Sequence, residues 1–93
     1  MPVISSFYGI LIRMYFGDHV PPHFHADYGE FSAQIRIADF GIEAGYLPPK
    51  ALALVVEWAS IHQSELMMNW KNLSINEPIP SVLKFFQFVI NSD

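Results

Sequence analysis

Residues 23–37 read HFHADYGEFSAQIRI, in which apolar and polar side chains alternate on both sides of a single glycine. Alternation with a period of two places successive side chains of a strand on opposite faces of a sheet. The segment Tyr28-Gly29-Glu30 is typical of a turn, so the stretch predicts two paired antiparallel strands. In the second of these strands the apolar residues share one face: Phe31, Ala33, Ile35 and Ile37.

Two further segments extend the predicted sheet. Residues 7–16 are aromatic and branched in the manner of a strand, and Gly17-Asp18 provides a break after them. Residues 39–45 hold two glycines around Ile42 and Glu43, which favours a tight turn and a fourth short strand. We therefore expect a small antiparallel sheet of three to four strands over about residues 7–46.

A single long helix is predicted over about residues 49–73. Pro48-Pro49 suits a first helical turn, and no further proline or glycine occurs before Pro78. At 100° per residue one face of this helix is apolar, and it would pack on the sheet. That face comprises Leu52, Val55, Val56, Ala59, Leu66, Trp70 and Leu73, while the opposite face comprises Lys50, Glu57, Ser60, Ser64 and Lys71. An apolar flank outside the main face could meet another subunit or the C-terminal segment: Leu54, Ile61 and Met68.

The last segment, about residues 80–91, favours a short helix that Ser81 could cap, because its apolar residues recur at helical spacing. Its aromatic content would equally suit a strand. The chain as a whole, residues 1–93, is expected to form a single α+β domain on length alone.

Composition narrows the classes of function. Apolar residues make up 52% of the chain and charged residues 15%, so some apolar surface is expected to meet a partner. The absence of cysteine excludes disulfides and thiolate zinc sites. A net charge of -4 argues against nucleic acid as a partner. No apolar run approaches the roughly 18 residues that span a bilayer, and residues 1–6 lack a basic signal region, so we expect no membrane association and a cytoplasmic location.

Three of the four histidines fall within one short segment, His19-Val20-Pro21-Pro22-His23-Phe24-His25. In an extended chain His23 and His25 point to one side while Phe24 points into the core. The two prolines restrict the backbone just before this pair. His19 and Asp18 could fold back across the turn, and three imidazoles with one carboxylate suit a divalent metal such as zinc, manganese or ferrous iron. The acidic surroundings also favour a cation over a phosphate.

Two other interpretations of these histidines stay open. In a catalytic one, His23 or His25 acts as general base, the other imidazole as acid, and Arg13 steadies a phosphate. In a structural one, the pair lines a solvent-facing strand edge and the prolines merely shape a loop. His62 lies at the edge of the apolar helix face with Glu65 within reach, and a structural role is expected for it.

Many of these segments also occur together in a known family. The chain resembles the small bacterial domain-of-unknown-function family numbered 4160, and the likeness covers roughly residues 1–73 but not the apolar stretch after Pro78. The likeness rests on residues 1–5, 7–10, 12–16, 18–19, 21–25, 28–30, 51–55, 57–58, 62, 65–66 and 69–70.

The resemblance implies a place in a two-gene module. Members resemble one half of such modules, often beside a second domain-of-unknown-function family numbered 2442, which suggests a toxin–antitoxin arrangement. We expect a protein-interaction component that pairs with a small protein from a neighbouring gene, and a homodimer is a second arrangement to consider. The alternative is a histidine-dependent hydrolase or ribonuclease-type toxin, with or without a bound metal.

Overall fold

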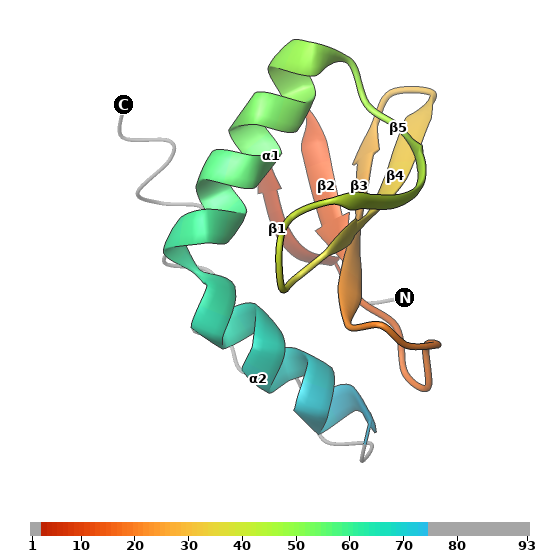
Figure 1. Cartoon of the computed structure of the whole chain (residues 1–93). Coiled ribbons are helices and arrows are strands. Elements are labelled where there is room, and N and C mark those ends of the chain that lie inside the picture. Colours follow the sequence, from red (N-terminus) through yellow and green to blue (C-terminus); the bar gives the residue numbers. More distant parts are fainter. Residues whose placement is uncertain (1–2, 75–93) are drawn as a thin grey trace.

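The computed structural model describes residues 3–74, which form an α+β fold, as expected. Within these residues one antiparallel sheet has the strand order β1-β2-β3-β4-β5, and two helices follow it (Figure 1). The strands are β1 (Val3–Phe7), β2 (Ile10–Arg13), β3 (His23–Tyr28), β4 (Phe31–Arg36) and β5 (Ile42–Tyr46), and the helices are α1 (Pro49–Ile61) and α2 (Gln63–Ser74). The segment predicted over about residues 80–91 lies outside the described residues.

The expectation of three to four strands is wrong, because residues 7–16 do not form one strand. The chain reverses at Tyr8 and Gly9, which have φ angles of 50° and 79°, and β1 pairs with β2 across this turn. Two-residue hairpin turns with positive φ at both positions favour Asn or Asp before Gly. A tyrosine at the first position hides the turn from sequence reasoning, so the sheet has one strand more than the upper estimate and begins at Val3.

The β3–β4 hairpin confirms the predicted alternation. Phe24 lies opposite Ile35, Ala26 lies opposite Ala33, and all four side chains are buried on the face that carries the helices. Next to this hairpin the edge strand β5 requires a glycine. Gly45 has φ +86°, and a Cβ built on it would lie 2.2 Å from the backbone oxygen of Ser32.

The expectation of one long helix is also wrong, since the helix breaks at His62. This residue has φ -117° and ψ 26°, and its N–H donates to the carbonyl of Ala59, three residues back. The Gln63 side-chain amide then donates to the carbonyls of Ile37 and Ala38, at 2.7 Å and 3.1 Å. The break is therefore accompanied by a tertiary contact with the turn that follows β4, and no proline or glycine marks it in the sequence.

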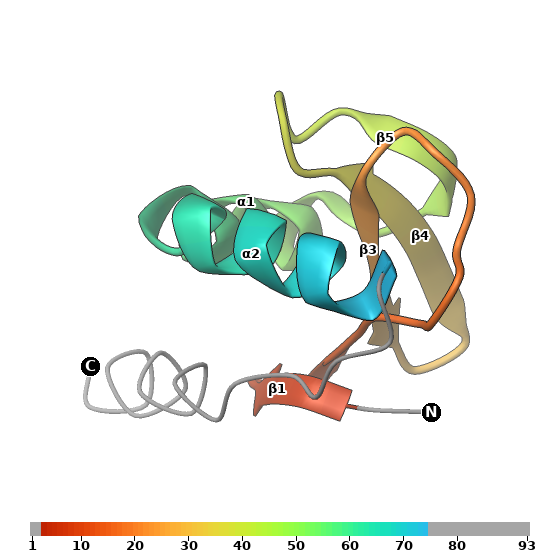
Figure 2. The same ribbon diagram turned by 90° about the horizontal axis from the view of Figure 1, so that it is seen from below.

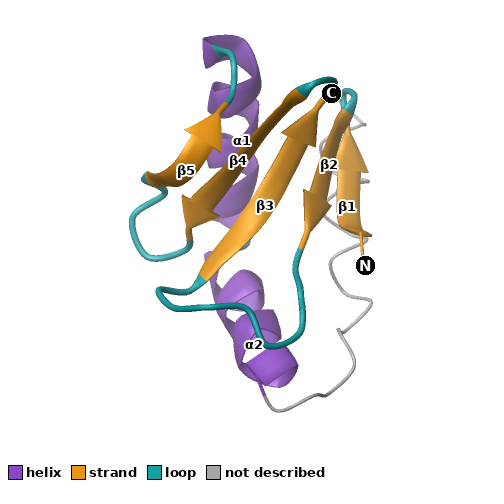
Figure 3. Cartoon of the chain, turned by 90° about the vertical axis from the view of Figure 1, so that its right-hand side faces the viewer, coloured by secondary structure: helices purple, strands orange, loops and turns teal. Residues whose placement is uncertain are grey.

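The core lies between the sheet and the helices, which cover the same face of it (Figures 2 and 3). Trp58 is fully buried, and its ring contacts Phe7 and Phe24 with centroid separations of 5.6 Å and 5.8 Å. The buried face of α1 is turned slightly from the predicted one, because Leu52 and Val56 are only half-buried. Between residues 3 and 74 no helix has the length and apolar character needed to cross a membrane.

Candidate metal centre

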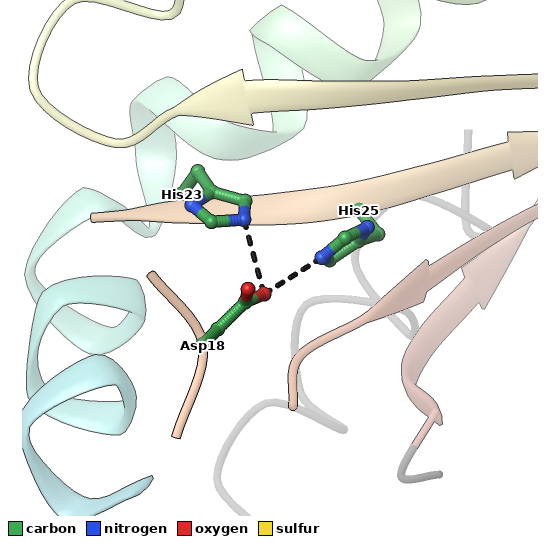
Figure 4. A group of neighbouring side chains, drawn as sticks. All are labelled: Asp18, His23 and His25. Atoms are coloured by element: carbon green, nitrogen blue, oxygen red, sulfur yellow. Dashed lines mark hydrogen bonds and ion pairs between the residues drawn. The ribbon is translucent and has the colours of Figure 1, made fainter. Parts of the chain in front are cut away.

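Asp18, His23 and His25 converge at one end of the sheet. Both histidines come from β3, the central strand, and Asp18 comes from the loop that joins β2 to β3. The loop is fixed at its end because the carbonyl of Pro22 accepts the N–H of Ile37 at 3.0 Å, which continues the pairing of β3 with β4. The carboxylate therefore folds back over the start of β3, as Figure 4 shows.

One carboxylate oxygen is close to both imidazoles. Asp18 Oδ2 lies 3.0 Å from His23 Nε2 and 2.9 Å from His25 Nε2. The three donor atoms all lie within 4.8 Å of one another. Zinc binds nitrogen and oxygen ligands at about 2.0–2.1 Å, which separates neighbouring donors by about 3 Å. The two separations from Asp18 Oδ2 match this spacing, and the two imidazole nitrogens lie within 4.8 Å of each other.

The protonation of His23 is set by its other ring nitrogen. His23 Nδ1 lies 2.8 Å from the carbonyl of Pro21, and a carbonyl only accepts, so Nδ1 carries the hydrogen. In the neutral ring Nε2 then has a bare lone pair. This atom is buried and makes no hydrogen bond, although it lies 3.0 Å from the Asp18 carboxylate. We take the distance as a close approach without hydrogen-bond geometry, and a lone pair there suits a metal ligand.

The second oxygen of Asp18 is also held. Asp18 Oδ1 accepts the backbone N–H of His19 at 2.9 Å and lies 3.1 Å from His19 Nδ1. Burial alone would raise the pKa of Asp18, but the hydrogen bonds from the His25 side chain and from the backbone N–H of His19 outweigh burial and lower that pKa below its ordinary 3.8. The carboxylate is thus ionised and oriented near neutral pH.

His19 is at the rim rather than within the group of three donors. Its side chain is 64% exposed, against 14% for Asp18 and 0% for His23. Its ring centroid lies 4.9 Å from that of His23. The structure therefore assembles three of the four predicted metal ligands around one point and leaves the fourth beside them.

Two aromatic residues that sequence reasoning did not assign to the site support the imidazoles. The Tyr15 ring meets His25 edge-on at a centroid distance of 4.4 Å. The Trp70 ring of α2 packs against His23 at 5.3 Å, a contact made by the helix that follows the break. Tyr15 could have been found because it follows Arg13 at strand spacing, whereas Trp70 carried only the signal of a core residue.

Arg13 lies beside the centre without contacting its donors. It is directly opposite His25 in the β2–β3 pairing, so both side chains leave the same face of the sheet. Its Nε donates to Asp27 Oδ2 at 2.8 Å, and Asp27 Oδ1 accepts the Ser32 hydroxyl at 2.8 Å. The guanidinium is therefore held by a neighbour on β3 rather than by the imidazoles.

His62 is remote from this group. Its Nδ1 contacts the Glu65 carboxylate and its ring stacks on Trp58 at a centroid distance of 6.2 Å. It is half-buried at the junction of the two helices, which agrees with the structural role expected for it.

A family model with the description Domain of unknown function (DUF4160) matches residues 9–71, about two thirds of the chain. The chain belongs to this family. The DUF4160 match begins at the first hairpin turn and ends within α2, so it includes all three donors and Arg13. No curated protein and no solved structure matches the chain.

Proposed function

We propose that this DUF4160 protein binds a divalent metal ion through Asp18, His23 and His25. The observation that carries the proposal is the buried Nε2 of His23, which has a lone pair, faces a carboxylate and makes no hydrogen bond. Buried polar atoms nearly always have a hydrogen-bond partner or a metal partner. A buried imidazole nitrogen without one, among other potential metal ligands, is therefore explained by a bound ion. A cation between the three donors satisfies all of them at once.

A cluster held only by hydrogen bonds explains less of the geometry. His25 Nε2 can donate to Asp18 Oδ2 at 2.9 Å, so this pair needs no metal. His23 would have to be a buried imidazolium to donate to the same oxygen, and its ring lies at 0% exposure. The neutral ring, whose N–H is at Nδ1 beside the Pro21 carbonyl, has no second N–H for that oxygen. The metal is the simpler partner for two imidazoles and one shared oxygen.

The donor set favours zinc or ferrous iron and leaves room at the ion. Two histidines and one carboxylate are the ligands of several catalytic zinc sites and of non-haem iron sites, both of which keep open positions. A metal at such a site can polarise an oxygen or lower the pKa of bound water. A hydrolase or ribonuclease-type activity would use an open centre of this kind.

Calorimetric titration of the metal-free protein with zinc tests the proposal. We expect one site per chain, with Asp18→Asn and His25→Gln each weakening it at least about tenfold, since loss of a ligand removes a direct bond. The matched control is His62→Gln, which removes a histidine paired with a carboxylate elsewhere. An absence of binding in the wild type, or equal binding in all four proteins, contradicts the proposal.

A second candidate function is pairing with a small protein from a neighbouring gene. The exposed side chains of Ile61 and Met68, each 59% accessible, favour it, because they form part of the apolar flank predicted from the sequence. Mixing the two purified proteins should give a complex by light scattering. The double variant Ile61→Glu with Met68→Glu should not form it, whereas Glu57→Gln, on the polar face, should.

A further inference from the structure

We infer that the open side of the centre takes an oxyanion, a phosphate or carboxylate group, bound jointly by the metal and by Arg13. This inference rests on the proposed metal site and names the chemistry of its ligand. The three protein donors leave at least one coordination position at the ion. What fills that position depends on the charge, hydrogen-bond donors and access around it.

Charge at the centre favours an anion. Asp18 offsets only half of a divalent charge, and the histidines are neutral when they bind metal. Arg13 and Asp27 form an ion pair at 2.8 Å and offset each other. One positive charge therefore remains at the ion, where an anionic ligand neutralises it.

Arg13 can supply the second contact to such an anion. Its Nε is used by Asp27, whereas its two terminal nitrogens have no bond to any residue in the range 3–74. The Ser32 hydroxyl donates to Asp27, and Asp27 in turn accepts from Arg13. The Arg13 side chain is therefore oriented before a ligand binds. A guanidinium presents paired N–H donors that match two oxygens of a phosphate or carboxylate.

The other arginine in the described residues is used differently. Arg36 lies opposite His23, yet its Nε donates to Asp39 at 2.9 Å and its Nη1 to Glu43 at 2.7 Å. These bonds fasten the turn between β4 and β5. Arg36 therefore serves as a matched control: it is the same residue type, it lies opposite the other histidine, and both its Nε and its Nη1 are already bonded to carboxylates.

Solvent also reaches the proposed metal site from the side on which Arg13 lies. The side chains of Arg13, His25 and Asp18 are 27%, 16% and 14% exposed, whereas His23 is closed off by Trp70. A small anion can thus approach the ion past His25 and Arg13.

Cobalt-loaded protein tests the inference, because the visible spectrum of Co²⁺ changes when an anion enters its coordination sphere. We would titrate methylphosphonate and, in a separate arm, acetate into wild type, Arg13→Gln, Arg13→Lys and Arg36→Gln. We expect a saturable change in the wild type, with the arm that saturates first identifying the oxyanion. Arg13→Gln should weaken anion binding about tenfold or more, the effect of one lost charge-assisted hydrogen bond, without changing cobalt affinity.

Arg13→Lys should weaken anion binding less, and Arg36→Gln should match the wild type. If cobalt-loaded wild type responds to neither anion, or if Arg13→Gln responds like the wild type, the inference is overturned while the metal site stands. If no cobalt binds at all, the proposed function fails first and the anion site falls with it. Circular dichroism of each variant confirms that the comparison is between folded proteins.

Discussion

Zinc should raise the melting temperature of the metal-free protein by about 10–20 °C. A ligand that binds only the folded state at a free concentration one hundred times its dissociation constant stabilises it by about 2.7 kcal/mol. In a domain of this size each kcal/mol corresponds to about 4–8 °C. A stabilisation of about 2.7 kcal/mol therefore corresponds to a rise in melting temperature of about 10–20 °C.

The arrangement of the donors favours the lower end of that range. Asp18, His23 and His25 lie within a single short stretch of chain, so the unfolded protein can still bring them together around zinc. Any affinity of the unfolded chain for zinc reduces the stabilisation of the folded state. In the folded state the tautomer of His23 is fixed and the Asp18 carboxylate is held by the His19 N–H. The folded protein should therefore bind zinc more tightly than the unfolded chain does.

Thermal unfolding followed by circular dichroism, with zinc and again after chelation, measures the shift. Asp18→Asn and His25→Gln should lose most of it, while His62→Gln should keep it. His23 is unsuitable for this test because its ring packs on Trp70. Replacing it would change the stability of the protein even without zinc. A wild-type shift below about 2 °C, or an undiminished shift in both ligand variants, would refute the reasoning.

Two further outcomes are expected. The pKa of Asp18 is lowered on folding, so its contribution to metal-free stability should be complete above its ordinary 3.8 and lost as the pH falls through the lowered value. Urea unfolding from pH 7 to acid should show a shallower acid loss in Asp18→Asn, and equal profiles would contradict this. Gly45→Ala should cost more than about 1 kcal/mol because its Cβ meets the Ser32 carbonyl at positive φ, whereas Gly17→Ala, with open space around it, should cost less in the same assay.

Elements defined by periodicity were predictable from the sequence. Residues 23–37 alternate so regularly that the strands, the turn and the faces of Phe24 and Ile35 all follow from them. The same alternation pairs His23 with His25 on one side. Those statements need only local rules of chain geometry.

Features set by long-range contacts were not predictable. The turn at Tyr8 carries a residue that the turn geometry does not favour, so the pattern of residues 7–16 resembles one strand. The helix break at His62 is accompanied by a hydrogen bond from Gln63 to Ile37, which follows β4 and is far away in the sequence. The contact of Trp70 with His23 follows from that break. Sequence reasoning therefore predicted that the two histidines share one side of the strand, but not that a second helix packs against them.

The three donors are held with unequal rigidity, which bears on how the centre works. His23 and His25 extend from the central strand, whose backbone is paired on both sides by β2 and β4. Asp18 lies in the loop between β2 and β3. This loop is bonded to the sheet at Pro22, and the residue before Asp18 is Gly17, which has a positive φ angle. Two ligands are thus preset by the fold, while the third depends on the loop. If the proposed metal binds, it would contact the histidines as a fixed pair and the loop through Asp18, so occupancy of the site and order in residues 14–22 would be coupled.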